Sequence, residues 1–207
     1  METSLGLFLL SVAVISLITG VMLPGPMTAA TVAKGYRNKN AGALIAIGHG
    51  VIELPLIAAM YLGVGYFLGL PMVVNGIYIV GGVALFYLGF RMFRTAGDAP
   101  GEVGGLPRNS IVTGIVVTGT NPAFYVWWIT LGAPLIAGAA RFGVIGIVLL
   151  AVVHWPCDLI WSEFLSLGTF KSRKWWTGRV PRIVFTVCAL VLLGFGAWFV
   201  FSGLSNL

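Results

Sequence analysis

The chain alternates between long apolar runs and short polar segments. Six runs are long enough to cross a bilayer as helices, since about 20 apolar residues span a hydrocarbon core of about 30 Å. They cover residues 5–23, 41–62, 72–93, 110–138, 142–168 and 183–201. The pattern predicts an all-α integral membrane protein with six transmembrane helices, in a single transmembrane domain over residues 1–207.

The composition agrees with this pattern. Of the 207 residues, 58% are hydrophobic and 9% are charged, and the mean hydropathy is +1.00. This leaves too little polar surface to cover a soluble globule of this size. A secretory signal peptide is the alternative for the first run, but its start, Met1-Glu2-Thr3, lacks the positive charges of such a peptide. We therefore expect the first run to be a retained helix.

The positive charges are distributed unevenly along the chain. Eleven of the twelve Lys and Arg residues follow the first, third and fifth runs, whereas only Arg141 follows the fourth. The positive-inside rule places the basic segments in the cytoplasm and both termini outside. The net charge of +6 therefore reflects basic segments that determine topology, and we expect no nucleic-acid partner. We expect a multi-pass protein of the cell (plasma) membrane, with the lipid bilayer as its partner.

The six runs divide into two halves of three. A segment at about 94–109 is rich in Gly and Pro and is predicted to be a cytoplasmic linker between halves at about 1–93 and 110–207. Because three is odd, halves of common fold must be inverted relative to each other. The spacings differ, with 23 residues from Pro26 to His49 and 32 from Pro122 to His154. The sequence predicts two inverted three-helix repeats, and chance similarity is the alternative.

Proline interrupts the first and fourth runs. Pro24, Gly25 and Pro26 break the first, and Asn121 and Pro122 break the fourth, because proline removes a backbone donor and clashes with the preceding turn. We expect Gly25 to permit backbone conformations barred to other residues. Freed backbone at membrane depth is tolerated where it is buried in protein or lines a wet cavity. These residues are candidates for an ion or zwitterion site, and simple proline kinks are the alternative.

Ionisable residues fall inside the predicted spans. His49 and Glu53 are four residues apart, as are His154 and Asp158, so each pair shares one helix face. A charge inside the bilayer costs several kcal/mol unless it is paired, protonated or hydrated, which makes these residues functional candidates. They suit a proton relay, a divalent metal or a substrate ammonium equally well. Local hydrogen bonds that join helices are the structural alternative, and Glu163 is predicted to face a helix interface.

Other features limit the function class. Tyr125, Trp127 and Trp128 follow the second break and either line the cavity or anchor in lipid. The chain has no His-Glu-x-x-His motif, no evident Ser-His dyad and no phosphate-binding loop. We therefore expect no enzyme activity and no cofactor.

Several of these motifs resemble the LysE/RhtB lysine-exporter superfamily of LysE-type translocators. They are the Pro24-Gly25-Pro26 break, the basic turn from Arg37, and the segment TGTNPAFYVWW at residues 118–128. The resemblance covers nearly the whole chain. It implies a six-span exporter of amino acids or related metabolites, with both breaks at the central cavity and proton-motive coupling.

The chain also departs from that family. Met27 follows Pro-Gly-Pro where members usually have Asn or a similar residue, and histidines at positions 49 and 154 are not typical of amino-acid exporters. We predict a secondary transporter for an amino acid or similar zwitterion, driven by a proton or ion gradient. The alternative is a divalent metal cation exporter of the same superfamily, using His49, Glu53, His154 and Asp158. The sequence leaves the substrate and the oligomeric state open, a homo-oligomer included.

Overall fold

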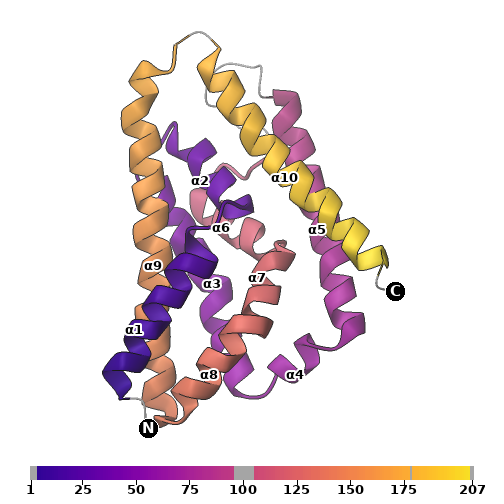
Figure 1. Cartoon of the computed structure of the whole chain (residues 1–207). Coiled ribbons are helices and arrows are strands. Elements are labelled where there is room, and N and C mark those ends of the chain that lie inside the picture. Colours follow the sequence, from indigo (N-terminus) through magenta and orange to yellow (C-terminus); the bar gives the residue numbers. More distant parts are fainter. Residues whose placement is uncertain (1–3, 96–104, 178, 206–207) are drawn as a thin grey trace.

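The computed structural model describes residues 4–95, 105–177 and 179–205, and every regular element there is a helix. The first half contains α1 (Leu5–Ser16), a π-helical turn (Leu17–Val21), α2 (Pro26–Gly35), α3 (Ala41–Tyr61), α4 (Gly65–Leu68) and α5 (Pro71–Thr95). The second contains α6 (Ser110–Gly119), α7 (Pro122–Trp127), a π-helical turn (Trp128–Gly132), α8 (Ala133–Ala140), α9 (Gly143–Ser172), a 3₁₀ turn (Arg173–Trp175) and α10 (Val180–Ser205). Figure 1 shows this order from the N- to the C-terminus.

The spans follow the predicted apolar runs. Within the described residues, five helices are long and apolar enough to cross a membrane, and Leu5–Val21 with Pro26–Gly35 forms a sixth span bent by 79°. The fourth run is also divided, into the short apolar helix α6 and the continuous helical segment Pro122–Ala140. The prediction of an all-α membrane protein with proline-broken first and fourth spans is confirmed.

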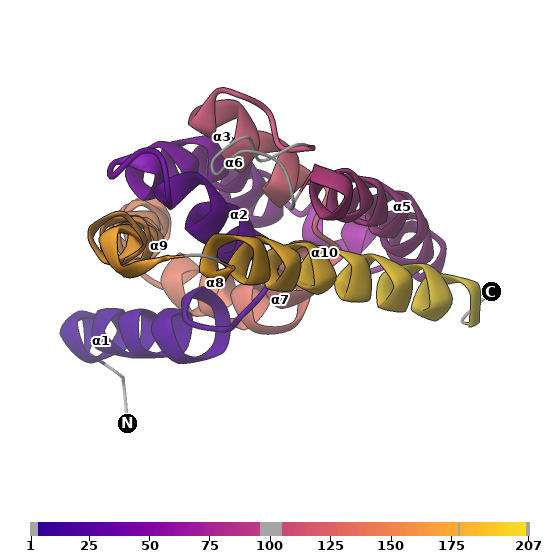
Figure 2. The ribbon, with the colours of Figure 1, turned by 90° about the horizontal axis from the view of Figure 1, so that it is seen from above.

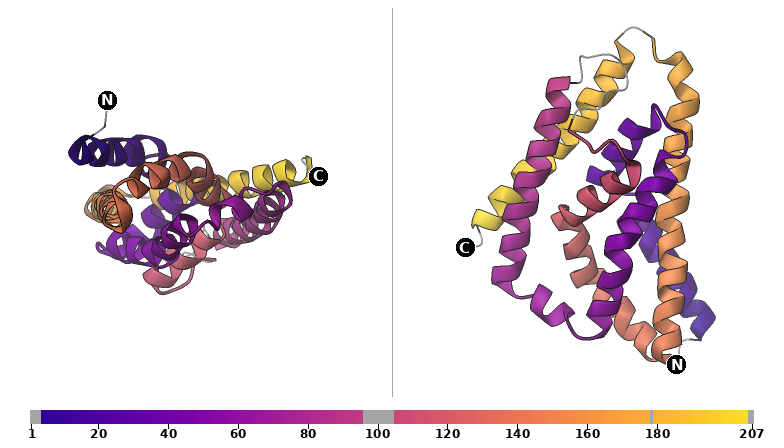
Figure 3. Two further views of the ribbon diagram at one scale, coloured as in Figure 1. Left: turned by 90° about the horizontal axis from the view of Figure 1, so that it is seen from below. Right: turned by 180° about the vertical axis from the view of Figure 1, so that it is seen from behind.

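The helices form two groups with the broken spans between them. α5 and α10 lie side by side on one flank, and α3 and α9 lie together on the other, with α1 along α9 (Figures 1 and 2). α2, α6 and α7 lie between the two flanks, and α8 lies against α9 near the N-terminal end of that helix (Figure 3). The two breaks therefore lie between the flanks, whereas α1 lies at the edge of the molecule (Figure 2).

Glycines bring the long helices close together. A Cβ atom at Gly82 of α5 would lie 2.8 Å from the backbone nitrogen of Val200 on α10, and one at Gly196 would lie 2.5 Å from that of Phe86. A Cβ at Gly42 of α3 would overlap the backbone carbonyl of Ser162 on α9. Small residues let helix backbones approach, which is the main source of packing energy between helices in lipid.

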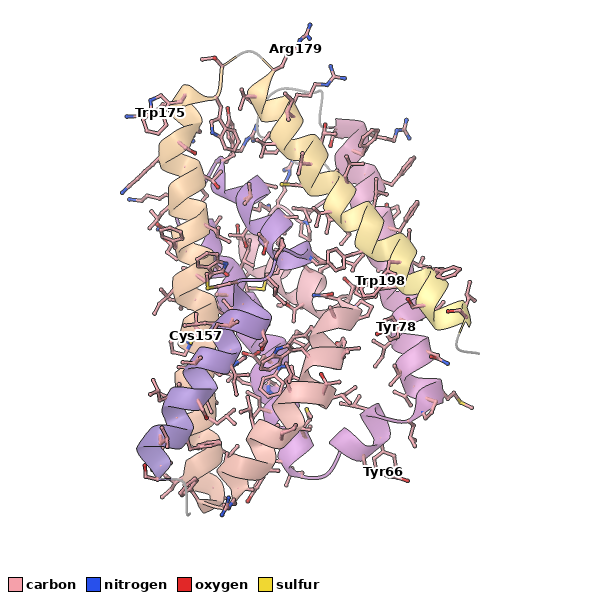
Figure 4. All side chains as sticks on the ribbon, in the orientation of Figure 1. Tyr66, Tyr78, Cys157, Trp175, Arg179 and Trp198 are labelled. Atoms are coloured by element: carbon pink, nitrogen blue, oxygen red, sulfur yellow. The ribbon has the colours of Figure 1, made fainter. Side chains whose placement is uncertain are left out.

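The surface and the two ends agree with a membrane setting. Large apolar side chains face outward on several helices, among them Leu10 of α1, Val80 of α5 and Phe201 of α10, each at least 60% exposed. Figure 4 places Trp175 and Arg179 at the end of the molecule opposite Tyr66. α3 and α9 run in opposite directions (Figure 1), as an inverted repeat requires, and the repeat itself stays a prediction.

Candidate functional site

Four ionisable side chains meet between α3 and α9. His49 and Glu53 lie near the midpoint of α3, and His154 and Asp158 lie near the midpoint of α9, each less than a tenth exposed. The close packing of Gly42 of α3 against α9 brings the two helix faces together. The predicted pairs are thus one cluster, which we call the His/acid cluster.

Glu53 is the centre of the cluster. Its Oε1 lies 2.9 Å from His49 Nε2 and 3.0 Å from His154 Nε2, and it accepts a hydrogen bond of 3.3 Å from Trp128 Nε1. Asp158 is more loosely held: Oδ1 lies 3.9 Å from His49 Nε2, and Oδ2 lies 3.6 Å from His154 Nε2. The bond between His154 and Glu53 joins α9 to α3, so the contacts are more than two local pairs within single helices.

The other imidazole nitrogens contact the two broken spans. His49 Nδ1 lies 3.0 Å from Thr118 Oγ1 near the end of α6, and His154 Nδ1 lies 2.6 Å from Ser16 Oγ at the end of α1. Each histidine therefore bridges the central acid and the helix that precedes a break. Neither Ser16 nor Thr118 is among the site residues predicted from the sequence. Thr118 begins the segment 118–128 that carries the family resemblance, whereas the signal at Ser16 is only a hydroxyl inside an apolar run.

A cavity of about 250 Å³ lies against the cluster. Its lining includes all four cluster residues, the first break and Asn121 of the second, so the structure brings together eight of the nine predicted site residues: Pro24, Gly25, Pro26, His49, Glu53, Asn121, His154 and Asp158. Trp127 and Trp128 also line it, which favours the cavity over a lipid anchor for these two rings. The volume lies just below the range of about 300–1,000 Å³ for drug-sized ligands, so it suits a small metabolite.

Four buried polar atoms at this cavity have no hydrogen-bond partner among the described residues. They are Thr31 Oγ1, Glu53 Oε2, Asp158 Oδ2 and Trp161 Nε1, and all four residues belong to the cavity lining. Leaving a buried polar group unpaired costs about 1–3 kcal/mol, and more for a charged group. A polar ligand with both donor and acceptor groups is therefore a suitable occupant of the cavity that these residues line.

The first break exposes the start of α2 to the cavity. Pro26 is the first residue of α2, and Gly25, Pro26, Met27 and Thr28 all line the cavity. Since the first N–H groups of a helix lack partners within it, this end attracts an anion. The prediction that Gly25 adopts a backbone conformation barred to other residues is wrong for this structure. Its φ of −162° is extended backbone that any residue adopts. No atom lies within 4 Å of a Cβ added there.

The second break contributes to the cavity in a different way from the first. Asn121 caps α7 by accepting a hydrogen bond of 3.2 Å from the backbone nitrogen of Ala123. Pro122 starts α7 but does not line the cavity, and its ring lies 2.9 Å from the position of a Cβ on Gly81 of α5. Tyr125 also lies outside the lining and donates a hydrogen bond of 3.0 Å to the carbonyl of Gly119. Pro122 therefore shapes the break, and Asn121 faces the cavity.

Glu163 has a structural contact. Its Oε2 accepts a hydrogen bond of 2.8 Å from the backbone nitrogen of Ala43 and lies 3.2 Å from Ser166 Oγ. It stabilises the first turn of α3, where carboxylates are favoured. It lies outside the cavity lining, in agreement with its predicted place at a helix interface.

The fold and the site together define a class of protein. Helices that cross the bilayer and enclose a cavity with ionisable side chains beside broken spans are typical of membrane transporters, whose sites lie near the midplane at such breaks. The cavity holds two carboxylates, two imidazoles and the open end of a helix, which can bind small charged solutes.

A comparison with family models assigns the family. Residues 18–203 match LysE type translocators, and the chain belongs to that family. Membership implies membrane transport of amino acids or related compounds, and it confirms the resemblance found in the sequence. Searches of curated proteins and of solved structures found no match to the chain.

Proposed function

We propose that the chain is a secondary transporter that exports an amino acid or a related small zwitterion across the plasma membrane in exchange for protons. The observation that carries the proposal is a set of four buried polar atoms without a hydrogen-bond partner among the described residues, all on residues that line one cavity. We further propose that the two halves act as inverted repeats within one transporter domain, with both termini outside. The His/acid cluster lies near the middle of α3 and α9, which suits a site reached alternately from both sides of the membrane.

Two of the unpartnered atoms suit the ammonium group of the substrate. Glu53 Oε2 and Asp158 Oδ2 can only accept hydrogen bonds when the carboxyls are ionised. The imidazoles lie 2.9 and 3.0 Å from Glu53 Oε1 but only 3.6–3.9 Å from Asp158, so they leave carboxylate oxygens without a donor. A cation or protons at these oxygens lower the cost of burying the two acids. An α-ammonium offers three donors and one positive charge.

The other two atoms suit the carboxylate group. Trp161 Nε1 can only donate, and the Thr31 hydroxyl can donate as well. Trp161 lies three residues after Asp158 on α9, so both side chains are on the same face of the helix. Met27 and Thr28, whose backbone N–H groups lie in the first turn of α2 and have no partner within the helix, line the same cavity. The two ends of a zwitterion thus have adjacent sites of opposite character.

Competition for the carboxylates provides the coupling. A proton and the substrate ammonium each carry one positive charge and each neutralise a carboxylate of the cluster. Release of the substrate to the outside leaves the carboxylates free to take up protons, and proton release to the cytoplasm restores the site. Each cycle then moves protons inward and substrate outward.

Carboxylate-to-amide changes test this function. We expect Glu53→Gln and Asp158→Asn to abolish pH-driven uptake of a labelled amino-acid mixture into inverted membrane vesicles that are acidic inside. Glu163→Gln is the matched control, since this carboxyl lies outside the cavity lining, and we expect uptake near that of the unchanged protein. Uptake that persists in both cluster variants would refute the proposed role of these carboxylates.

A divalent metal ion is the second candidate cargo. Donor atoms of His49, Glu53 and Asp158 lie within 4.8 Å of one another, close enough to share one ion. Imidazole and carboxylate are suitable ligands for zinc and similar ions. On this reading, a His49→Ala, His154→Ala double variant loses resistance to divalent metals while amino-acid efflux continues. A growth screen against toxic amino acids, their analogues and divalent metals decides between the two cargos.

A further inference from the structure

The cavity wall beyond the carboxylate end of the proposed site is apolar. Leu165 lies four residues after Trp161 on α9, so it continues the same helix face. Met27 of α2 and Phe195 of α10 line the cavity as well. The order along α9 is thus acid, indole donor and apolar side chain, at Asp158, Trp161 and Leu165.

Charge in the wall is restricted to the His/acid cluster. Among the described residues that line the cavity, the ionisable groups are His49, Glu53, His154 and Asp158, and there is no Lys or Arg. The two acids form one centre, since His49 Nε2 lies 2.9 Å from Glu53 Oε1 and 3.9 Å from Asp158 Oδ1. A second ammonium on the substrate would find no separate acid, and a second carboxylate would find no Lys or Arg.

We infer that the substrate is a neutral amino acid with an apolar side chain; the inference rests on the proposed function. Its ammonium lies at Glu53 and Asp158, its carboxylate lies at Trp161 and the start of α2, and its side chain contacts Leu165 and Phe195. Basic and acidic amino acids bind more weakly, because their side-chain charge would be buried without a partner. The site therefore selects by the charge and shape of the side chain.

Competition in proteoliposomes tests this substrate class. We expect excess unlabelled leucine, methionine or phenylalanine to reduce pH-driven uptake of labelled leucine at least tenfold more effectively than lysine or glutamate. Phe195→Ala enlarges the cavity next to the substrate side chain, so we expect the uptake of phenylalanine relative to leucine to rise several-fold. Phe201→Ala, at a position 71% exposed on the same helix, is the matched control and leaves the ratio unchanged.

The possible outcomes separate this inference from the proposed function. If lysine or glutamate is transported and competes as well as leucine, the substrate class is overturned while amino-acid export stands. If the ratio changes equally in Phe195→Ala and Phe201→Ala, the assignment of Phe195 to the side-chain wall is wrong. If none of the amino acids is transported, the proposed function itself fails.

A separate observation concerns the proton between His154 and Glu53. Ser16 Oγ lies 2.6 Å from the carbonyl oxygen of Val12, which can only accept, and 2.6 Å from His154 Nδ1. The single hydroxyl hydrogen must point at the carbonyl, since two oxygens at that distance repel each other without one. Ser16 therefore accepts from His154, and Nδ1 carries the hydrogen.

The hydrogen on Nδ1 determines what Nε2, on the other side of the His154 ring, can do. With Nδ1 protonated, Nε2 either carries a second proton and donates to Glu53, or accepts a proton from the Glu53 carboxyl at 3.0 Å. Either way, one proton lies between these two atoms. Thr118 has no comparable second bond, so its contact with His49 does not set a tautomer. The groups that face this proton are His49, Asp158 and Trp128 Nε1.

We propose that Ser16 is a positioning residue that keeps the exchangeable proton at His154 and Glu53, and so links the first broken span to proton coupling. This also rests on the proposed function. Without the hydroxyl, Nδ1–H of His154 no longer has its acceptor. In the other neutral tautomer Nε2 keeps the hydrogen and the lone pair is on Nδ1, so Nε2 cannot accept a proton from Glu53. Binding of the substrate at Glu53 Oε2 and Asp158 Oδ2 does not depend on this bond.

Two transport measurements distinguish a positioning role of Ser16 from a general structural role. We expect Ser16→Ala to reduce pH-driven accumulation of labelled substrate at least tenfold, while exchange of labelled for unlabelled substrate without a pH gradient stays within about twofold. Ser16→Thr restores the hydroxyl and pH-driven accumulation. Ser11→Ala removes the same kind of bond on the same helix, from Ser11 Oγ to Phe8 O at 2.6 Å, and leaves both modes unchanged.

Three results would overturn this role. Normal pH-driven accumulation in Ser16→Ala would show that the hydroxyl is not needed. Equal loss of accumulation and exchange in a variant that purifies normally would show a general structural role, as would a failure of Ser16→Thr to restore coupling.

Discussion

Gly48 controls how closely α3 approaches α6. A Cβ atom at this position would overlap the carbonyl oxygen of Ile111 and lie 2.9 Å from the backbone nitrogen of Ile115. Gly114 faces it, with a Cβ position 3.0 Å from the Cα of Gly48. Because these neighbours are backbone atoms, no side-chain rotation relieves the overlap, and Gly48→Ala must push α6 away from α3.

The size of the effect follows from this geometry. Restoring ordinary contact with the carbonyl oxygen of Ile111, at about 3.5–4.0 Å, requires a shift of roughly 1.5–2 Å. A gap of about 1 Å already loses up to about half of the dispersion attraction between the facing atoms. Overpacking of this kind costs about 1–3 kcal/mol. The same shift stretches the 3.0 Å contact of Thr118 with His49 beyond hydrogen-bonding distance.

Thermal unfolding in detergent measures this cost. For a chain of this size we expect a decrease in Tm of roughly 2–12 °C, with loss of transport. Gly168→Ala on α9 is the control, since no atom lies within 4 Å of a Cβ there, and we expect an unchanged or slightly higher Tm. If Gly48→Ala unfolds at the same temperature as the unchanged protein, the close crossing of α3 and α6 is wrong.

Three further changes test the breaks, the caps and the topology. Gly25→Ala should leave Tm unchanged, because the site is open and its φ of −162° is extended, but transport should fall as the methyl group enters the cavity; a large drop in Tm would contradict this geometry. Asn109→Ala removes hydrogen bonds of 2.8 and 3.4 Å to the start of α6, so we expect a loss of about 0.5–2 kcal/mol, measured by unfolding and restored by Asn109→Asp. In a chain without its two native cysteines, Arg141→Cys should react with a membrane-impermeant maleimide on intact cells and Arg173→Cys should not; the opposite result would invert the predicted topology.

The helix breaks show which features follow from local sequence. Pro26 and Pro122 each begin a helix, as proline does at a first helical turn. The interruptions could therefore be predicted residue by residue. Which of these residues faces the cavity could not, because Pro122 lies against Gly81 while Asn121 lines the cavity.

The His/acid cluster shows the same division. The four-residue spacing places His49 with Glu53, and His154 with Asp158, on a shared helix face without any knowledge of the neighbours. That both faces meet, and that Glu53 Oε1 contacts both imidazoles, depends on the packing of α3 against α9. Ser16 shows the limit most clearly, since nothing near it in the chain indicates a partner 138 residues away.

The sequence by itself determined the apolar spans, the proline breaks and the pairs of ionisable residues. These depend on length, composition and short spacings, which act within one helix. Tertiary structure decided which helix faces turn inward and which polar atoms stay unpartnered at the cavity. Lipid-facing and protein-facing surfaces of a span are both largely apolar, so the rotation of each helix depends on close contacts such as Gly42 against Ser162.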